Sequence, residues 1–293
     1  MNHDDHESAA STTSPATVAH PAPVEIARDY YNSDDADTFY ATVWGGEDLH
    51  LGIYESPTES IFDASRRTVE RMASRCGRLG PGARVLDLGA GFGGTARYLA
   101  RRFDCHVTAL NLSEKENARC RRMNAEQGLA DRIDVVDGSF QSLPFPDGGY
   151  DVVWSQDALL HSPNRRQALG EAVRVLAPGG ELVFTDPMQA DDCPAGVLGP
   201  ILERIHLETL GSPGYYRQVA DELGLREVSV EDQTPNLVRH YTRVLEVTAE
   251  RQEELSRSIS TAYLDHMKTG LRRWIEGGRR GHLAWAIFHF RKS

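Results

Sequence analysis

A glycine-rich segment, Val85 to Gly94, most constrains the fold of this 293-residue chain. Its sequence VLDLGAGFGG places Gly89, Gly91 and Gly94 at the G-x-G-x-x-G spacing. Glycines at this spacing allow a tight turn and let the backbone approach a ligand at the N-terminus of a helix. An apolar run precedes the glycines and a helical pattern follows them. The segment therefore predicts a strand, a ligand-binding turn and a helix, in that order.

Strand-like and helical patterns alternate along most of the chain after this segment. Such alternation is typical of an α/β fold, in which a mostly parallel sheet carries helices on both faces. The expected strands are residues 85–88, 106–110, 133–136, 151–155, 182–185, 226–230 and 284–290. The expected helices include residues 57–78, 95–102, 113–127 and 165–176, and a polar helical region spans 237–275.

The chain is predicted to form a single domain, residues 24–293, after a short tail. Residues 1–23 are rich in Ser, Thr, Ala and Pro and contain few aliphatic side chains. They cannot bury enough apolar surface to offset the entropy of ordering, so we expect a disordered acidic tail. Residues 187–224 separate two expected strands by far more than the usual connection of about 2–6 residues. This length indicates a helical insertion that binds substrate.

Composition argues against several kinds of partner. The net charge is −11, with 43 acidic and 32 basic residues, whereas nucleic-acid binding depends on clustered Lys and Arg. No stretch approaches the roughly 18 apolar residues that a membrane helix needs, and the first residues lack a secretory signal pattern. The four cysteines form no C-x-x-C pair, so we expect a reduced, cytoplasmic protein without a metal site. These features do not define an oligomeric state.

The residues at the ends of the first two expected strands bear on the kind of cofactor. A nicotinamide or flavin dinucleotide normally requires an acidic residue at the tip of the second strand, about 20 positions after the loop. Asn111 stands there, which disfavours an NAD-dependent oxidoreductase. Asp87 lies within the first strand, two residues before Gly89. A buried carboxylate at that position suits a cationic ligand.

The segment Val85–Gly94, with a helix behind it, resembles the first motif of the class I S-adenosylmethionine-dependent methyltransferases. The resemblance implies their Rossmann-like fold with a seven-stranded sheet, S-adenosyl-L-methionine as cofactor, and a loop that wraps the methionine end. It also implies that Asp87 holds the cofactor's ammonium group, and that Glu116 takes the ribose contact usually made by an acid at Asn111. The cofactor-binding residues implied are Asp87, Gly89, Gly91, Gly94, Asn111, Leu112, Glu116, Ser139, Phe140 and Gln156.

A closer resemblance covers nearly the whole chain after the tail. It is to the sarcosine/dimethylglycine N-methyltransferases, which make the compatible solute glycine betaine. This resemblance implies methylation of sarcosine to dimethylglycine and of dimethylglycine to glycine betaine. Phosphoethanolamine or another small amine is the alternative substrate, and a non-catalytic adenosylmethionine-binding module is an alternative of another class. The matching segments are FYATVWGGEDLHLGIYE (39–55), WSQDALLHSP (154–163), TDPM (185–188), LVRHYTRV (237–244) and WIEGGRRGHLAW (274–285).

Candidate catalytic residues follow the fourth expected strand. Asp157 and His161 are four residues apart, so on a helix they share one face and can form a hydrogen-bonded pair. His161 is expected to accept the amine proton, and Asp157 to orient it or to balance the ammonium charge. By resemblance, residues 24–56 form an N-terminal lid. Aromatic faces suit a cationic product and arginine suits a carboxylate. The expected substrate-binding residues are Tyr31, Tyr40, Trp44, Arg204, Arg217 and Arg239.

Overall fold

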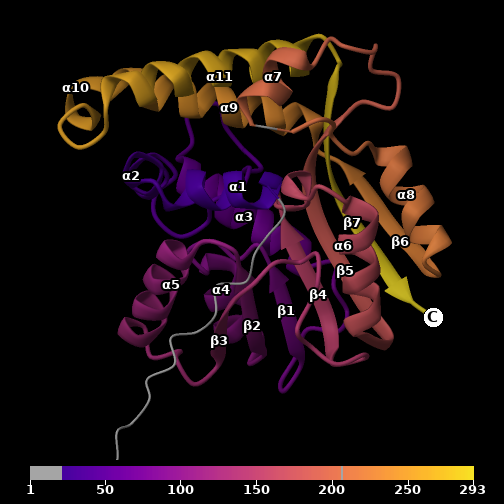
Figure 1. Cartoon of the computed structure of the whole chain (residues 1–293). Helices are drawn as coiled ribbons and strands as arrows, with labels where there is room; N and C mark the ends of the chain where they lie inside the picture. Colours follow the sequence, from indigo (N-terminus) through magenta and orange to yellow (C-terminus); the bar gives the residue numbers. More distant parts are fainter. Residues whose placement is uncertain (1–21, 206) are drawn as a thin grey trace, which may run out of the picture.

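The computed structural model describes residues 22–205 and 207–293, and a seven-stranded sheet lies at its centre (Figure 1). The strand order is β3-β2-β1-β4-β5-β7-β6. Strand β7 runs antiparallel to β5 and β6, whereas the other neighbouring pairs are parallel. This arrangement confirms the predicted α/β class. The strands are β1 (Arg84–Leu88), β2 (His106–Asn111), β3 (Ile133–Asp137), β4 (Tyr150–Gln156), β5 (Leu176–Gln189), β6 (Leu225–Asp232) and β7 (Leu283–Lys292).

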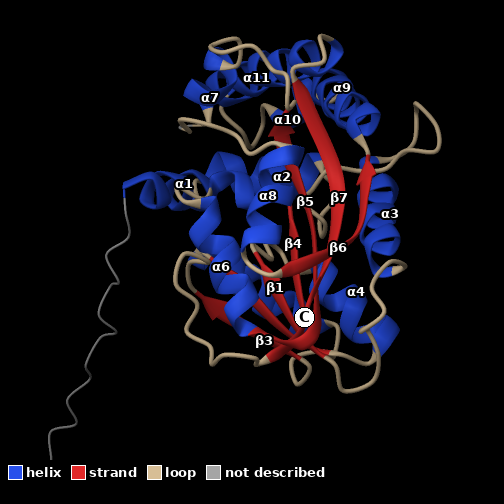
Figure 2. Ribbon diagram, turned by 90° about the vertical axis from the view of Figure 1, so that its right-hand side faces the viewer, coloured by secondary structure: helices blue, strands red, loops and turns tan. Residues whose placement is uncertain are grey.

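Helices cover both faces of the sheet (Figure 2). Helices α3 (Ile61–Ala73) and α4 (Gly94–Phe103) pack on one face, and α6 (Arg165–Val175) and α8 (Pro213–Glu222) pack on the other. The remaining helical elements are α1 (Ala22–Asn32), α2 (Asp34–Val43), α5 (Glu114–Glu126), the short 3-10 helix η1 (Leu159–His161), α7 (Gly199–Arg204), α9 (Thr234–Glu250), α10 (Gln252–Leu255) and α11 (Thr261–Arg279).

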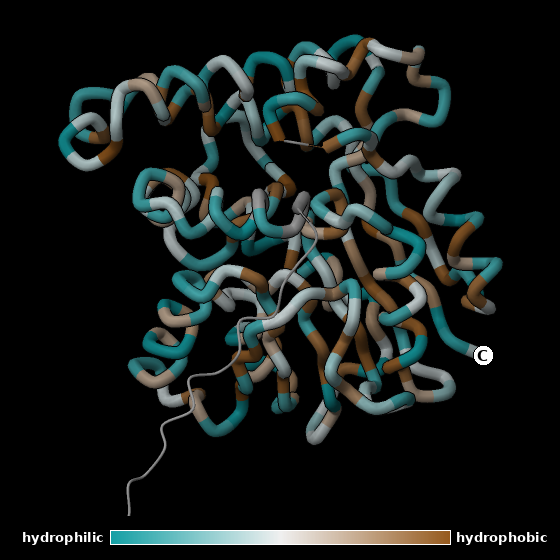
Figure 3. Tube along the Cα trace, viewed as in Figure 1, coloured by the Kyte–Doolittle hydropathy of each residue, from teal (hydrophilic) through white to brown (hydrophobic). Residues whose placement is uncertain are grey.

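The side chains of β1 show how the two faces are built. Val85 packs with α3 and α4, whereas Leu86 and Leu88 belong to the cluster that contains α6 and α8. Successive side chains of a strand point to opposite faces, so a run that is buried on both sides must be apolar throughout. Figure 3 shows apolar residues along the strands and more polar ones on the outer helices. Asp87 interrupts this apolar run and is itself buried.

The start of α5 directs a carboxylate toward the edge of the sheet. Ser113 is the N-cap residue, and its side chain accepts a hydrogen bond from the backbone N–H of Glu116. A serine N-cap satisfies one of the free N–H groups of the first helical turn. The cap fixes the first turn beside the tip of β2, where Glu116 is buried. The local sequence thus positions an acidic side chain near Asn111.

The carboxyl ends of the parallel strands lie beneath a layer of further helices. Figure 1 shows α9 and α11 across the top of the molecule, with α1 and α2 between this layer and the sheet. Residues 187–224 contain α7 and α8, so the helical content of the expected insertion is observed. The sequence did not predict α1 and α2, and the described part of the chain starts within α1, at Ala22. Residues 1–21 of the predicted tail lie outside the described residues.

Candidate active site

A large cavity, here called the glycine-loop cavity, opens at the carboxyl ends of β1, β2 and β4. It contains about 800 Å³ of empty space, part of which is open to solvent. Pockets of roughly 300–1,000 Å³ at this edge of an α/β sheet are typical sites for small ligands. Its lining residues include Arg28, Tyr31, Leu49, Gly89, Gly91, Asn111, Leu112, Glu116, Ser139, Phe140, Gln156, Asp157 and His161.

The glycine loop needs glycine for two separate reasons. Gly89 has a φ of +79°, and a Cβ added to it would collide with the Cβ of Ala158. A side chain there would be strained by the left-handed backbone and would also overlap Ala158, which follows β4. Gly94 begins α4, and a Cβ at this position would collide with Asp48 and with the carbonyl of Glu47. The residues after α2 therefore pack directly against the glycine loop.

The tip of β2 carries the polar side chains that the sequence placed there. Asn111 Nδ2 donates a hydrogen bond of 2.8 Å to Glu116 Oε2, and both side chains line the glycine-loop cavity. Burial raises the pKa of Glu116 to about 7. Leu112, Ser139 and Phe140 line the same cavity. This region combines an amide, a carboxyl group and apolar surface, which suits the sugar and base of a nucleoside.

A second, smaller space, here called the small polar cavity, joins the first at Gly89, Gly91, Leu49 and Gln156. Asp87, Gly94, Asp48 and His50 also line it. Asp87 Oδ2 and Gln156 Nε2 are buried without hydrogen-bond partners in the described structure. Burial raises the pKa of Asp87 to about 7. Because buried polar groups normally have partners, these free atoms indicate a ligand with both donor and acceptor groups.

His161 ends η1, the short 3-10 helix that follows β4, and it contacts helix α1, which is distant in the sequence. Its Nε2 atom lies 3.0 Å from the hydroxyl oxygen of Tyr31, which belongs to α1. The two rings meet edge to face, with centroids 5.6 Å apart. Burial, together with the charge of Arg165, lowers the pKa of His161 to about 4. The imidazole is therefore neutral near pH 7.

Asp157 does not form the expected hydrogen-bonded pair with His161. Its backbone has a φ of 51°, so Asp157 and His161 do not lie on a common α-helix. The carboxylate instead accepts hydrogen bonds from the backbone N–H of Leu51 at 2.7 Å and from Trp285 Nε1 at 2.8 Å. Both side chains nevertheless line the cavities. The structure thus places Asp157 and His161 at one site but holds each through different partners.

A third space, here called the aromatic cavity, meets the glycine-loop cavity at Tyr31, Leu49, Asp157 and His161. It lies between the sheet edge and the helical layer above. Arg204 is the one arginine or lysine among its described lining residues. Arg204 Nε is buried without a hydrogen-bond partner in the described part of the chain. The other lining side chains include Tyr30, Tyr40, Trp44, Tyr241, His266, Met267 and Trp274.

The other two predicted arginines lie elsewhere. Arg217 is on α8 and pairs with Glu227, and both side chains are exposed to solvent. Arg239 donates a hydrogen bond of 3.1 Å to the carbonyl oxygen of Tyr54 and lines none of the three cavities. The structure therefore brings only Arg204, of the three, to the expected substrate site.

Several lining residues were not predicted individually. Tyr241 and Trp274 lie in the segments 237–244 and 274–285, which carried the family resemblance without an assigned role. Asp48 and His50 belong to segment 39–55, and they line the small polar cavity. In the sequence, the one hint of a role for Asp48 and His50 is that an acidic residue and a histidine follow Trp44 and two glycines closely. Their proximity to Asp87 depends on the folded chain.

Comparison with known proteins assigns the family. A family model for a methyltransferase domain matches residues 86–184. A sarcosine/dimethylglycine N-methyltransferase of Halorhodospira halochloris is 57% identical over 270 residues, which cover 92% of this chain and 97% of that protein. The chain belongs to the sarcosine/dimethylglycine N-methyltransferase family. This confirms the resemblance drawn from the sequence motifs.

Solved structures agree with this assignment. A candidate sarcosine dimethylglycine methyltransferase from Galdieria sulphuraria is 44% identical, with a TM-score of 0.84, and the match covers 89% of this chain and 99% of that one. A phosphoethanolamine N-methyltransferase 2 of Haemonchus contortus, in complex with S-adenosyl-L-methionine, is 18% identical with a TM-score of 0.78. That match covers 94% of this chain and 60% of that one, and it shows a shared fold.

The cavities of this methyltransferase fit S-adenosyl-L-methionine, the cofactor of the family. The glycine-loop cavity offers groups for a nucleoside, and the small polar cavity holds the unpaired Asp87 and Gln156 atoms, which suit a charged amino-acid end. Among residues 22–205 and 207–293, no group of His, Cys, Asp and Glu side chains is arranged to hold a metal ion. The same residues include no helix with the length and apolar character needed to cross a membrane.

Proposed function

We propose that this chain methylates the nitrogen of sarcosine and of dimethylglycine, which gives dimethylglycine and glycine betaine. The observation that carries the proposal is the aromatic cavity, in which one arginine stands among tyrosine and tryptophan side chains. Both substrates join a cationic amine to a carboxylate across one carbon. The cavity offers a matching pair of features, because aromatic faces attract cations and a guanidinium binds a carboxylate.

The groups that would hold the amine end come from the N-terminal helices and from the turn after β4. Tyr31, Tyr40 and Trp44 line one side of the aromatic cavity, and Asp157 lies where this cavity meets the glycine-loop cavity. Tyr40 and Trp44 pack with ring centroids 5.0 Å apart. The faces of these aromatic rings stabilise positive charge on the substrate nitrogen without donating a hydrogen bond to it. Asp157 supplies the countercharge.

Arg204 is the residue proposed to bind the substrate carboxylate. Its Nη2 atom lies 2.7 Å from the sulfur of Met267, and its Nε atom has no hydrogen-bond partner among the described residues. A Cβ added at Gly270 would collide with the guanidinium, so this glycine of α11 makes room for it. A guanidinium beside a cavity, with a buried Nε–H that lacks a partner and no carboxylate paired with it among the described residues, favours an anionic ligand.

His161 is proposed to accept the proton that the amine must lose. S-adenosyl-L-methionine supplies an activated methyl group when bound. The attacking nitrogen needs a free lone pair, so each methylation releases one proton from the amine. His161 is neutral near pH 7 and lies at the junction of the two cavities. The contact with Tyr31 orients its ring, and the proton passes to His161 directly or through a water molecule.

Other substrates and partners fit the site less well. Phosphoethanolamine carries a phosphate, which would favour a cluster of cations, whereas Arg204 is the one arginine or lysine among the described residues of the aromatic cavity. Asn111 at the tip of β2 continues to disfavour a dinucleotide cofactor. We also propose a cytoplasmic location, which the four free cysteines support.

A labelled-methyl assay tests the proposal. Purified protein is incubated with labelled S-adenosylmethionine and, separately, with glycine, sarcosine, dimethylglycine or phosphoethanolamine. We expect label in the sarcosine and dimethylglycine products. Failure to label either compound would refute the proposed function, and transfer to phosphoethanolamine alone would identify the other substrate class.

The role of Arg204 has its own prediction. Arg204→Gln removes the charge that faces the substrate carboxylate, so the KM for dimethylglycine should rise about tenfold or more, as expected for loss of a charged hydrogen bond of about 1.5–3 kcal/mol. Arg217→Gln is the matched control, since Arg217 forms an exposed ion pair on α8 and should leave KM unchanged. An equal effect of both changes would contradict the assignment.

A further inference from the structure

The loop after α2 carries a buried histidine whose role the proposed function does not include. His50 is only 5% exposed and lines the small polar cavity together with Asp87 and Gln156. The backbone around the histidine is held firmly: the carbonyl oxygen of His50 accepts hydrogen bonds from Trp44 Nε1 at 3.1 Å and from Ser65 Oγ at 2.9 Å. The ring therefore has a defined position beside the glycine loop.

The two ring nitrogens of His50 have different surroundings. Nδ1 lies 3.1 Å from the carbonyl oxygen of Leu51, and a carbonyl only accepts, so Nδ1 carries a proton. Nε2 is buried and has no hydrogen-bond partner among the described residues. With Nδ1 protonated, Nε2 is an acceptor in the neutral ring and a donor in the imidazolium ion. The charge of the ring therefore decides what His50 can bind.

The groups around His50 favour the imidazolium ion. Burial alone lowers the pKa of His50, but Asp48 and Asp157 outweigh burial and raise the pKa above its ordinary value. His50 Nε2 lies 3.8 Å from Asp48 Oδ1, and Asp87 on β1 interacts with the same ring. His240 on α9 also interacts with His50, and the pKa of His240 is lowered to about 3, first by burial and then by His50, so His240 stays neutral.

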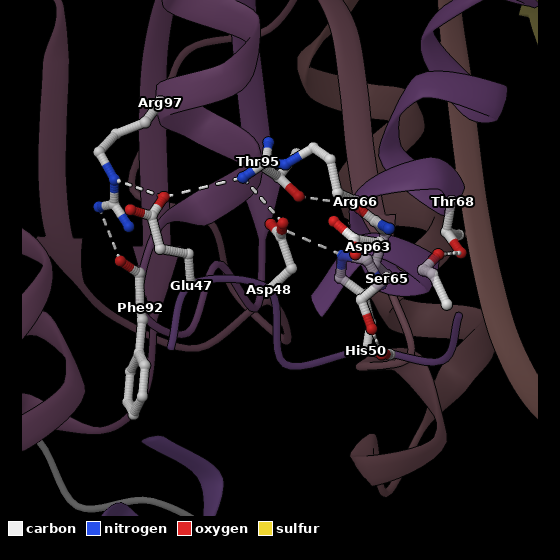
Figure 4. A network of polar contacts seen from close by, with 12 residues as sticks. Glu47, Asp48, His50, Asp63, Ser65, Arg66, Thr68, Phe92, Thr95 and Arg97 are labelled. Carbon is white, nitrogen blue, oxygen red and sulfur yellow. Dashed lines mark hydrogen bonds and ion pairs between the residues drawn. The ribbon is translucent and has the colours of Figure 1, made fainter. Parts of the chain in front are cut away.

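Asp48 is already engaged by a cation. Arg66 Nη2 on α3 lies 2.8 Å from Asp48 Oδ2 and 3.7 Å from Glu47 Oε2 (Figure 4). This arginine offsets the negative charge of Asp48 that would otherwise repel an anion at the cavity. At 3.8 Å from Asp48 Oδ1, His50 Nε2 lies within ion-pair range of this carboxylate but makes no hydrogen bond to it, so the Nε2–H group can donate to a ligand.

We propose that His50 binds the carboxylate of the amino-acid end of S-adenosylmethionine through Nε2–H. Gln156 Nε2 is the second free donor of this cavity, while Gln156 Oε1 is held by Thr95 at 2.7 Å and Trp154 at 2.8 Å. Asp87 Oδ2 is a free acceptor and takes the ammonium group, whereas the other carboxylate of this cavity, Asp48, is paired with Arg66. Two free donors and the unpaired Asp87 carboxylate in a buried space match both charges of an amino acid. The inference rests on the cofactor and not on the amine substrate.

Calorimetric binding of three ligands to the full-length chain tests this inference. S-adenosylhomocysteine has both charged groups, its decarboxylated analogue keeps the ammonium group, and methylthioadenosine has neither. His50→Gln should weaken S-adenosylhomocysteine binding about tenfold or more. The same change should leave the dissociation constants of the other two ligands within about twofold. Unaltered methylthioadenosine binding also shows that the variant folds.

The control and the contrary outcomes are well separated. His106→Gln alters an exposed histidine at the start of β2, where it pairs with Asp134, and should change the affinity for none of the ligands. Equal loss for all three ligands would mean that His50 only supports the fold. Loss for the decarboxylated analogue would mean that His50 contacts the ammonium group. Either result, or no loss at all, overturns the proposal, and none depends on whether sarcosine is methylated.

The pH dependence gives a second measure. In the unaltered chain, the affinity for S-adenosylhomocysteine should fall as pH rises through the pKa of His50, because the neutral ring no longer donates from Nε2. The decarboxylated analogue should lack this alkaline loss, and so should the His50→Gln variant. Both ligands should share the loss on the acidic side, below about pH 7, where Asp87 becomes protonated. An alkaline loss that persists in the variant contradicts the role of His50.

Discussion

Tyr31 and His161 lie 130 residues apart in the chain, yet their side chains meet at 3.0 Å where the two large cavities join. This contact gives the histidine an orientation that the sequence alone did not supply. The expected partner was Asp157, which instead bonds to Leu51 and Trp285. The tyrosine hydroxyl and the neutral imidazole together form a short path along which a proton can leave the amine.

A change at His161 tests this path. His161→Gln keeps a polar group near Tyr31 but cannot take up a proton, so kcat should fall about 100-fold or more. The dissociation constant of S-adenosylhomocysteine should remain within about twofold, because binding of the cofactor uses other residues. Single-turnover kinetics and calorimetry measure the two quantities. Normal turnover in this variant would remove His161 from the mechanism.

At the scale of elements, α8 and β5 support the turn that carries His161. Asp186 of β5 accepts hydrogen bonds from the backbone N–H of Leu160 at 2.9 Å and from the hydroxyl of Tyr216 at 2.6 Å. Arg165 donates to the carbonyl oxygen of Leu160 at 2.9 Å. Both backbone polar groups of Leu160, the residue before His161, therefore have hydrogen-bond partners. Tyr216 is a positioning residue that acts through Asp186.

Tyr216→Phe should therefore affect catalysis more than binding. Loss of the hydroxyl leaves the Asp186 carboxylate with one partner fewer and loosens η1, so kcat should fall about threefold to tenfold at an unchanged affinity for S-adenosylhomocysteine. Tyr215→Phe is the matched control, because Tyr215 is exposed on the same helix. Similar kinetics for the two variants would show that the Asp186 contact does not position His161.

The regular elements were predictable because their patterns are local. Apolar runs such as that around Val85 marked six of the strands, and Ser113 marked the start of α5, within one or two residues of the observed bounds. The exception is β5, which was predicted at 182–185 and spans Leu176–Gln189. Helices α1 and α2 were missed. In α2, Phe39 and Val43 are buried in a cluster with Val244 of α9 and Leu271 of α11, so the residues that stabilise this helix are distant in the sequence. Short helices depend on such packing rather than on propensity.

At the scale of the whole molecule, the sequence predicted the types of site residue better than their partners. The glycine loop, Asp87 and Glu116 follow from the spacing between a strand and its helix. The placement of Arg204 rather than Arg217 beside the aromatic cavity depends on how α7 and α8 pack against distant elements. The role proposed for His50 also required the fold, because the histidine is 37 positions before Asp87 in the chain.

A buried carboxylate outside the three cavities connects three segments of the chain through hydrogen bonds. Glu181 of β5 accepts hydrogen bonds from the Cys76 thiol at 2.9 Å, from the backbone N–H of Gly77 at 2.8 Å and from Arg291 Nη2 at 2.5 Å. His289 Nε2 lies 3.5 Å from the same side chain. Burial alone raises the pKa of Glu181, but His289, Cys76 and Arg291 outweigh burial and hold the pKa well below its ordinary value.

Glu181→Gln should lower the free energy of unfolding by about 2–4 kcal/mol at pH 7, since it leaves Arg291 without its buried partner. The pKa of Glu181 is lower in the folded chain than in the unfolded one. Its contribution is therefore fully present above about pH 4.5 and is lost as pH falls below that value. The difference in unfolding free energy between the variant and the unaltered chain should shrink accordingly in denaturant titrations at lower pH.

Glu227→Gln is the control. Glu227 forms an exposed pair with Arg217, so this change should alter the free energy of unfolding by less than about 0.5 kcal/mol. A pH-independent difference for Glu181→Gln would mean that the ionised carboxylate does not stabilise the fold.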